Sequence, residues 1–599
     1  MYNEIQNTYQ QLVLQYQSIA DSKKKQLKLI AFARFFSFIG IVPVYYYLSP
    51  VNNILGFGVS LIFLIAFLFL IKKYIQTEKQ LTFHQRLVKI NQDEIKTLNR
   101  DYSSFDPGIE FTDIHHDYSY DLDLYGPGSF FQFLNRTITA RGKKKLAELL
   151  NQSQRPVEEI TDKQAAIQEL AEELNWRQNF LAKDSENEGQ KTNKVDESIH
   201  QQLSLKSEKT IKYLLIIFPP IAFLIVTLFF AKIIGQSYVV GVLLAQWIIF
   251  LIYSKTIATF YKQFQSQSKI LTRYVEMLQQ IETMPFKSNY LIKLKQQLSQ
   301  EEKSATNSTA ELQKILNEFD YRQNILVAFV LNSILLWDVR CIYKLYHWQQ
   351  NYSNNIPGWF EVIAEIDALI SLANCNYNHP DWTTPTVIHS KSGVKSTDLG
   401  HPLIDETRCI KNSFQIVDDE QIVIITGANM AGKSTFLRTV GINLILASNG
   451  CKVCASSFEF SPCRIYTNMR TSDNLMNDES YFYAELLRLQ SMLTLLRKGE
   501  NLFVILDEML KGTNSTDKLN GSKELINQLV LLKTHGIVAT HDLGLTELTS
   551  LYPTQLKNQC FEVQLLQDEL KFDYKLTDGV TRTMNATFLM KKMGIIPTN

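Results

Sequence analysis

Four long apolar runs interrupt an otherwise polar chain, and they come in two closely spaced pairs. The runs cover residues 29–48, 54–71, 213–231 and 233–253. A helix needs about 18 or more apolar residues to cross a bilayer, and a buried core helix is rarely apolar on every face for so long. The pattern therefore predicts two transmembrane helical hairpins, 29–71 and 213–253. The alternative is a pair of buried helical hairpins in a large soluble protein.

The charges that flank these runs predict how the hairpins are oriented. The two connecting loops carry almost no positive charge: SPVNN has none and the second loop has Lys232 alone. Lysines cluster at the outer ends of both hairpins, at positions 23, 24, 25, 28, 72, 73, 206, 209, 212 and 255. By the positive-inside rule both hairpins dip outward and return. We therefore expect about four transmembrane helices in the inner (cytoplasmic) membrane, with the N-terminus and every large polar segment in the cytoplasm.

The polar segments between the runs are mostly helical in character. From Val387 onward strands and helices alternate instead, which predicts an α/β domain with a mainly parallel sheet. A chain of 599 residues is too long for one core. We expect a multidomain protein: a cytoplasmic N-terminal helix (1–28), a linker helix (72–124), a helical core in two parts (125–212 and 254–383), and the α/β domain (384–599).

The amino-acid composition excludes few functional classes. With 61 Lys and Arg against 60 Asp and Glu, the formal net charge is +1, so there is no global electrostatic argument for nucleic acid. Seven cysteines, an odd number scattered along the chain without a paired pattern, indicate a reducing compartment. Cys451 and Cys454 have CxxC spacing but no second pair nearby, so they are better read as core thiols. His115–Asp117 with Asp121 and Asp123 suit a polar loop as well as a metal site, and the basic run at 141–145 is typical of a solvated helix face.

The stretch GANMAGKST, directly after the apolar run at 422–425, predicts a phosphate-binding loop. It fits the pattern G-x-x-x-x-G-K-[ST] and is followed by an apolar helix, which is the context that this motif requires. Backbone N–H groups at the start of that helix would hold phosphates. Lys433 would reach the β- and γ-phosphates, and the Ser434 hydroxyl would bind Mg²⁺. The loop contributes Gly427, Ala428, Asn429, Met430, Ala431, Gly432, Lys433, Ser434 and Thr435.

Two further strands end in residues that suit nucleotide hydrolysis. NLFVILDEM predicts a buried strand that ends at Asp507 and Glu508. Asp507 would help to hold Mg²⁺, and Glu508 would orient and deprotonate the attacking water. A third strand, GIVAT, leads to His541, at the position expected of a sensor for the γ-phosphate. The predicted catalytic residues are therefore Glu508, Lys433 and His541, and the predicted metal ligands are Ser434 and Asp507.

The segment from about Thr384 to Pro597 resembles the ATPase domain of the MutS family of DNA mismatch-repair proteins. The resemblance rests on GANMAGKSTFLR, ESYFYAELLRLQ, LDEMLKGTNS and ATHDLGLTEL, which occur in the family's order. GSFFQFLNRTITARGKKKLAELL and FEVIAEIDALISLANCNYNHPDWTTPTV resemble the two ends of the family's helical core. The resemblance implies an α/β P-loop ATPase domain of ABC/MutS type, C-terminal to a MutS-core-like helical domain.

The resemblance also implies ATP and Mg²⁺ as cofactors and a homodimer with composite sites. Ser480 would contact the γ-phosphate bound by the other subunit, Thr513 and Asn514 would lie in the loop after the Mg²⁺-site strand, and Asn429 would be the family's phosphate-loop Asn. His401 and Pro402 match the family's His-Pro pair, although Gly400 replaces the usual Arg.

Several departures from the family pattern bear on the substrate. From the resemblance we expect no mismatch-reading or connector domains before Tyr125, where the first hairpin lies, and we expect the second hairpin to interrupt the helical core. The aromatic residue that stacks on adenine is replaced near Cys409. Two functional classes therefore stay open. One is a membrane-anchored ATPase that binds DNA, which the family favours; the other is a membrane remodelling or transport-type ATPase without a DNA substrate. Membrane lipid is an expected partner in both.

Overall fold

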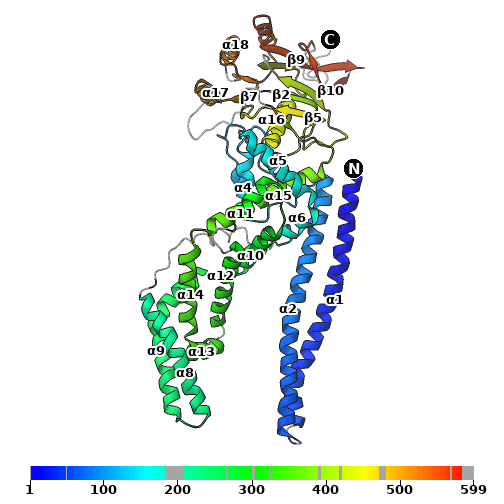
Figure 1. The fold of residues 1–599 in the computed structure, drawn as a ribbon. Helices are drawn as coiled ribbons and strands as arrows, with labels where there is room; N and C mark the ends of the chain where they lie inside the picture. Colours follow the sequence, from blue (N-terminus) through cyan, green and yellow to red (C-terminus); the bar gives the residue numbers. More distant parts are fainter. Residues whose placement is uncertain are drawn as a thin grey trace. The chain divides into compact units, whose positions relative to one another are not determined.

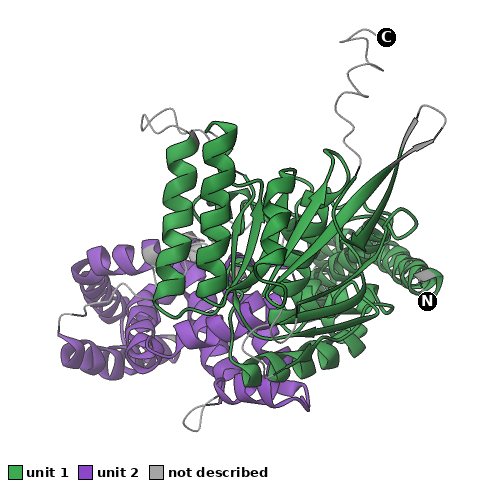
Figure 2. Ribbon diagram, turned by 90° about the horizontal axis from the view of Figure 1, so that it is seen from above, with its two compact units in different colours: residues 1–136, 146–182, 369–599 green, residues 137–145, 183–368 purple. Residues whose placement is uncertain are grey.

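The computed structural model divides the chain into two compact units (Figure 2). Unit 1 contains residues 1–136, 146–182 and 369–599, and unit 2 contains residues 137–145 and 183–368. The structure describes residues 2–48, 50, 52–183, 205, 207–264, 268–299, 304–323, 325–388, 393–416, 421–470, 481–511, 513–566 and 569–582.

The first pair of apolar runs lies in two long helices of unit 1, α1 (Tyr2–Leu48) and α2 (Asn53–Leu98), which pack against each other (Figure 1). Each apolar run continues without a break into a polar arm, so the expected N-terminal helix (1–28) is part of α1. The expected linker helix (72–124) is α-helical only as far as Leu98, where α2 ends, and the prediction was wrong for the residues after it. The turn between them is fixed by Asn52, whose side chain accepts hydrogen bonds from the backbone N–H groups of Ile54 and Leu55. Arg34 stacks on the ring of Tyr74, 4.6 Å from its centroid.

The polar arms are joined to the rest of unit 1 by buried polar contacts. Glu94 of α2 is 2% exposed and forms an ion pair with Arg136, with Nε–Oε1 at 2.5 Å. The Glu94 carboxylate also accepts a hydrogen bond from the amide of Asn378, and Tyr9 of α1 donates to that residue's Oδ1. The other elements of this region are η1 (Ile109–Phe111), α3 (Phe130–Leu134), α5 (Val157–Glu172) and α6 (Leu174–Leu181). Two helices, α4 (Ala140–Leu150) and α15 (Ile356–Asn378), belong partly to unit 1 and partly to unit 2.

The C-terminal part of unit 1 contains the expected alternation of strands and helices. A six-stranded sheet has the order β10-β9-β4-β8-β7-β6, with every neighbouring pair parallel except β10 with β9. Its strands are β4 (Ile422–Gly427), β6 (Arg464–Asn468), β7 (Leu502–Asp507), β8 (His535–Thr540), β9 (Leu556–Leu566) and β10 (Glu569–Asp578). A second, four-stranded sheet has the order β1-β5-β2-β3, from β1 (Thr386–Val387), β2 (Val394–Leu399), β3 (Asn412–Ile416) and β5 (Ser457–Phe460).

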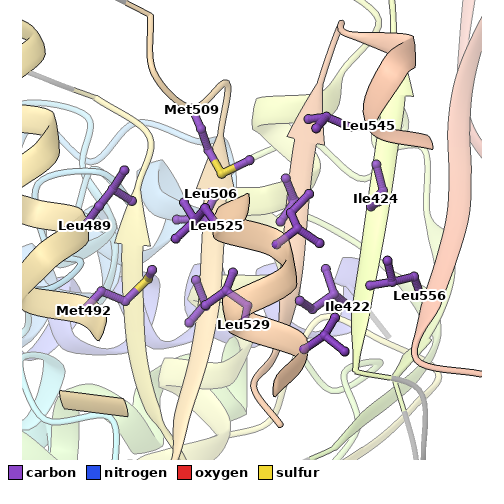
Figure 3. Close-up of a cluster of buried hydrophobic side chains, with 14 of the residues drawn as sticks. Ile422, Ile424, Leu489, Met492, Leu506, Met509, Leu525, Leu529, Leu545 and Leu556 are labelled. Atoms are coloured by element: carbon purple, nitrogen blue, oxygen red, sulfur yellow. The ribbon is translucent and has the colours of Figure 1, made fainter. Parts of the chain in front are cut away.

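Helices cover both faces of the six-stranded sheet. The helix α16 (Lys433–Ser448) packs on β4, β7 and β8. On the other face, α17 (Tyr481–Arg497), α18 (Ser515–Leu531) and η3 (Leu543–Ser550) contribute to a core cluster that includes Ile424, Met492 and Leu529 (Figure 3). Because successive strand residues point to opposite faces, fully buried runs such as β4 and β7 serve both layers. This sheet holds the strand ends that carry the candidate chemistry.

The acidic loop that resembled a possible metal site has a structural role. Asp117 pairs with Arg464 at 2.8 Å. Asp121 is fully buried and accepts hydrogen bonds from the hydroxyl of Thr467 and from Arg488. Within the described residues no group of three or more His, Cys, Asp or Glu side chains is placed to hold a metal ion. Cys451 and Cys454 are free and buried, as expected of core thiols.

Unit 2 is helical and contains the second pair of apolar runs. Its helices are α8 (Glu208–Phe230), α9 (Gln236–Phe264), α10 (Ser268–Thr283), α11 (Asn289–Gln296), α12 (Ala305–Asp320), η2 (Tyr321–Gln323), α13 (Ile325–Leu335) and α14 (Trp337–Tyr352). The helices α8 and α9 form a hairpin. Four helices in the described residues (α1, α2, α8 and α9) are long and apolar enough to cross a membrane by length and composition.

The basic run at 141–145 is not the solvated helix face that was expected. The ammonium of Lys145 lies 2.9 Å from Glu361 and 3.0 Å from Glu365, and Arg141 stacks over the ring of Phe360. These contacts join the start of α4 to the neighbouring part of α15. The expectation was wrong because the sequence pattern of a short helix does not show which distant carboxylates pack against it.

Candidate nucleotide site

The structure brings together the three strand ends that the sequence singled out. β4, β8 and β7 are consecutive in the sheet and parallel. The GANMAGKST loop follows β4, His541 follows β8, and Asp507 is the last residue of β7. In open α/β sheets, ligands bind in the crevice outside the carboxyl ends of such strands. The predicted side chains therefore face one common site.

Two positions of the loop, Gly427 and Gly432, have no room for a side chain or favour glycine by their backbone conformation. A Cβ atom on Gly427 would lie 2.9 Å from the backbone oxygen of Phe561. Gly432 has φ +103°, a left-handed conformation that favours glycine, and it is the N-cap of α16 without any side-chain cap hydrogen bond. The first N–H groups of a helix have no intrahelical partner. This terminus is therefore available to bind an anion.

Lys433 is held directly over the loop. Its ammonium donates hydrogen bonds to the backbone oxygens of Gly427 at 2.6 Å and Ala428 at 3.1 Å, and the residue is 6% exposed. Burial lowers the pKa of Lys433, although Glu508 and Asp507 act in the opposite direction. Two neutral carbonyls are weak partners for a buried cation. Phosphate oxygens would supply the negative charge that this position favours.

Ser434 and Asp507 form the pair expected at a Mg²⁺ site. The Ser434 hydroxyl donates to Oδ2 of Asp507 at 2.5 Å, and Asp507 is 9% exposed. Burial raises the pKa of the Asp507 carboxyl, and the hydrogen bond from Ser434 opposes this shift. A hydroxyl and a carboxylate oxygen at adjacent positions are suitable ligands for Mg²⁺. The residues present therefore fit this ion.

Glu508 lies beside His541, with Oε1 of the carboxylate 3.2 Å from Nδ1 of the imidazole. Burial acts to raise the pKa of Glu508, but His541, Lys511 and Lys433 outweigh it, so the pKa is lowered overall. The carboxylate is thus ionised at neutral pH and accepts hydrogen bonds. Glu508 also has φ +55°, a costly conformation for a non-glycine residue that is typical of functional sites.

A cavity of 450 Å³ extends from the loop toward β10. This volume lies within the 300–1,000 Å³ typical of small-molecule sites. Besides the loop and Glu508, its lining includes Leu399, His401, Ile404, Cys409, Ile410, Phe561 and Tyr574. Cys409 does lie in the wall where an aromatic side chain was expected to be replaced. Tyr574 supplies an aromatic ring from β10 instead, 3.1 Å from where a Cβ on Gly432 would be.

One residue that lines this cavity, Tyr574, and one that supports the loop after Asp507, Glu485, were not singled out by the sequence. Tyr574 lies in a strand with no recognisable motif, and its backbone oxygen accepts a hydrogen bond from Asn412. Glu485 lies inside the quoted stretch ESYFYAELL and is 2% exposed. Its carboxylate accepts hydrogen bonds from the backbone N–H groups of Leu510 at 2.6 Å and Lys511 at 3.1 Å. The only signal for it was an acidic residue among apolar positions of a helix.

The other residues that the sequence singled out differ in exposure and in the contacts that they make. Asn429 and Met430 are exposed, the latter to 78%. Asn514 is the N-cap of α18, where its side chain accepts from the N–H of Asp517. Ser480 lies outside the described residues, so its role in a second subunit's site stays a prediction. At Gly400 a Cβ would lie 2.9 Å from Sγ of Cys454, which explains why no larger residue stands there.

Comparison with known proteins points to one family. Residues 423–598 match the family model described as MutS domain V. The chain is 26% identical over 292 residues to the human "MutS protein homolog 4", covering 46% of this chain and 28% of that protein. It is 28% identical over 307 residues to "DNA mismatch repair protein MutS" of Chlorobaculum tepidum, covering 49% and 34%. For the MutS of Thermotoga petrophila the figures are 30% over 238 residues, covering 39% and 29%. The matched part spans about a third of the length of these relatives.

Proposed function

Because residues 423–598 match MutS domain V, we propose that this chain is a membrane-anchored, Mg²⁺-dependent ATPase that acts on DNA beside the inner (cytoplasmic) membrane. One observation carries the ATPase part of the proposal. Lys433, Ser434, Asp507, Glu508 and His541 converge at the adjacent carboxyl ends of β4, β7 and β8, next to the free N-terminus of α16.

Each residue of this group has a definable task. ATP with Mg²⁺ would supply a phosphoryl group whose charge is partly neutralised by the metal. Lys433 would exchange its two carbonyl partners for phosphate oxygens, and Ser434 and Asp507 would hold the metal. Glu508, whose pKa is lowered by His541, Lys511 and Lys433 against the effect of burial, would accept a hydrogen bond from the attacking water and take its proton. His541 would sense the terminal phosphate, and its contact with Glu508 at 3.2 Å would orient that carboxylate.

A homodimer completes the proposed site. The family resemblance assigns Ser480 to the nucleotide of the neighbouring subunit, so each protomer would complete its partner's site. ABC-type ATPases, to which the motif set is similar, use such composite sites. ATP binding would then close the dimer, and hydrolysis would reopen it and move the helical arms.

Membrane anchoring is supported by the surface of the two hairpins. The apolar segments of α1, α2, α8 and α9 are mostly uncovered by other parts of their own units: in each, no more than 17% of the most apolar stretch is buried. Large side chains such as Phe35, Ile54 and Phe223 are more than half exposed. Water would make this exposure very costly, since each buried CH₂ contributes about 0.8 kcal/mol. A bilayer would accept these side chains.

DNA is the proposed substrate because the relatives are mismatch-repair proteins by name. The second candidate is a membrane remodelling or transport-type ATPase that has the same ATPase domain but no DNA substrate. It is favoured by a specific observation: the polar arms of α1 and α2 are fixed to unit 1 by the buried network around Glu94 and Arg136. In that case the membrane segments themselves would be what the ATPase moves.

The test is ATP hydrolysis by the full chain in nanodiscs, with and without duplex, mismatched, branched and single-stranded DNA. Stimulation by one DNA form that weakens as salt rises would support the DNA proposal, because phosphate contacts release counterions. Hydrolysis that is indifferent to every DNA but responsive to lipid composition would favour the second candidate. No Mg²⁺-dependent hydrolysis under any condition would refute both.

Two variants test the assignment of residues. Lys433→Ala should abolish nucleotide binding. Glu508→Gln should bind ATP normally, hydrolyse it at least about 100-fold more slowly, as expected from the loss of a general base, and accumulate as an ATP-bound dimer. Normal hydrolysis by Glu508→Gln would show that the base has been assigned to the wrong residue.

A further inference from the structure

The helix α13 is short, uncharged and poorly covered. It spans Ile325–Leu335, with the sequence ILVAFVLNSIL. On its outer face Phe329 is 55% exposed and Val330 is 53% exposed. With 11 residues at about 1.5 Å each it is about 16 Å long, too short to cross a hydrocarbon core of about 30 Å. Apolar segments of this length are typical of buried core helices or of re-entrant and interfacial membrane segments.

The helix is attached to the second hairpin well inside its apolar run. It packs against both α8 and α9. The indole N–H of Trp247 donates to the hydroxyl of Ser333 at 2.8 Å, and the ring of Trp247 lies 5.5 Å from that of Phe329. The side chain of Gln246, fully buried, donates to the backbone oxygen of Ile334. These contacts use the polar groups of an otherwise apolar stretch of α9.

The position of these contacts along α9 gives their depth. Lys255 is the first charged residue after the apolar run, and Trp247 precedes it by eight residues. At 1.5 Å per residue this is about 12 Å along the helix axis. If α9 crosses a bilayer with Lys255 at its cytoplasmic surface, the attachment of α13 lies within the cytoplasmic half of the hydrocarbon core.

A group of aromatic and basic side chains flanks α13 on both sides in the sequence. Before it, Arg322 stacks on the ring of Tyr261, with Cζ 4.7 Å from the centroid. After it, Trp337 stacks on Tyr321 with ring centroids 6.1 Å apart. Arg340 in turn lies over the Trp337 ring. Trp, Tyr and basic residues are enriched at the level of lipid headgroups. The segment between Arg322 and Asp338, which contains α13, has no charged residue.

We propose that α13 is a third membrane-embedded helix of the second hairpin: it inserts into the cytoplasmic leaflet beside α8 and α9, with Phe329 and Val330 in contact with lipid acyl chains. The proposal rests on the membrane anchoring of this protein proposed above. The occupant of the exposed face is lipid because Phe329 adjoins Trp247 of α9, and the apolar run of that helix is itself exposed, with Leu251 60% exposed. An interaction with lipid on this face would anchor the arm formed by α12 and α14 to the bilayer surface.

The test places a spin label at single cysteines in the full chain reconstituted in nanodiscs. Six of the seven native cysteines are buried and Cys409 is partly buried, so a Cys409→Ser background leaves only the introduced thiol accessible. Labels are attached at Phe329→Cys and Val330→Cys. Leu251→Cys in α9 serves as the lipid-facing control, and Gln350→Cys, exposed at the end of α14, as the aqueous control. The collision rates of each label with oxygen and with a water-soluble nickel chelate are then measured.

The expected result is an oxygen-to-nickel collision ratio at both α13 positions that matches Leu251→Cys and exceeds Gln350→Cys several-fold. A ratio at α13 equal to that of Gln350→Cys, with Leu251→Cys still in lipid, would overturn this inference and leave the anchoring proposal intact. Low collision rates with both reagents would also overturn it, because they would show that a second copy of the chain or another protein covers α13. An aqueous signal at Leu251→Cys would refute the anchoring proposal itself.

Discussion

The loop that carries Glu508 is held in place by one buried carboxylate, and this contact can be tested. Glu485 accepts two backbone hydrogen bonds, from the N–H groups of Leu510 and Lys511. Glu508 and Leu510 both have left-handed backbone conformations, with φ +55° and +58°. Because Glu485 does not line the nucleotide cavity, its replacement should change the loop without removing a ligand of the nucleotide. The perturbation is Glu485→Gln, which keeps the size of the side chain.

The magnitude follows from the balance of strain and hydrogen bonding. A left-handed conformation costs about 1–2 kcal/mol for each non-glycine residue, so about 2–4 kcal/mol for the two. A hydrogen bond to a charged group contributes about 1.5–3 kcal/mol, so the two bonds to Glu485 offset this strain with little excess. In the Glu485→Gln variant the oxygen of the side-chain amide would accept one bond, whereas its NH₂ group could not accept the other. Loss of about 1.5–3 kcal/mol corresponds to an approximately 10- to 150-fold change in equilibrium or rate.

The assay is steady-state ATP hydrolysis together with an equilibrium measurement of ATP binding, both in nanodiscs. We expect kcat to fall about 10- to 150-fold in Glu485→Gln, while the ATP dissociation constant changes little, because Lys433 and Ser434 are untouched. Glu547→Gln is the matched control, since this exposed glutamate pairs with Lys523 on the surface. Unchanged kcat in Glu485→Gln would refute the argument. A parallel loss of ATP affinity would show instead that Glu485 supports the whole site.

Three further results are expected from full-chain unfolding measured in nanodiscs. Glu94→Ala leaves Arg136 as an uncompensated buried cation and should lower the free energy of unfolding by about 3–5 kcal/mol. The double variant Glu94→Leu with Arg136→Met should recover most of that loss. Equal stability of Glu94→Ala and the parent would refute the role of the pair. Burial lowers the pKa of His379 to about 4 from the usual 6.5, so the unfolded chain binds the proton more readily than the folded chain. The free energy of unfolding should therefore fall as the pH decreases from about 6.5 toward 4. His379→Gln should flatten this part of the curve of stability against pH. Gly536→Ala should destabilise by about 3 kcal/mol or more, because the added Cβ would lie 2.2 Å from the backbone oxygen of Val504; a melting temperature within error of the parent would contradict this.

The parts of the fold that could be predicted from the sequence are those encoded by local pattern. The apolar run before GANMAGKST is the central strand β4, and NLFVILD is β7. The apolar runs at 29–48 and 54–71 lie in α1 and α2, and those at 213–231 and 233–253 lie in α8 and α9 except for residues 231 and 233–235, which belong to the turn between them. Fixed spacing also placed Lys433, Ser434 and Asp507 together, because parallel strands bring their carboxyl ends to one edge of a sheet.

Contacts between segments that are distant in the sequence could not be predicted from the sequence pattern. Nothing in residues 569–578 indicates that Tyr574 lines the cavity, because β10 reaches it only through its pairing with β9. Likewise, Glu94 and Arg136 are 42 residues apart, and no periodicity pairs them. The role of Glu485 depends on the loop after β7, which approaches α17 only in the folded chain. In each case the partner is set by packing, whereas the motif residues are set by strand order.

The end of α2 gives a physical basis for coupling the nucleotide site to the first hairpin. Arg100, two residues after α2, has φ +65° and donates a hydrogen bond to the backbone oxygen of Pro402 at 2.8 Å. The neighbouring residue, His401, lines the nucleotide cavity. A shift of the His401–Pro402 segment when the cavity is filled must therefore either move Arg100 or break this bond. Because α2 is one continuous helix from Asn53 to Leu98, a movement at its polar end cannot be absorbed by a flexible joint within it. The hydrogen bond from Arg100 to Pro402 is therefore the contact through which filling the cavity would act on α2.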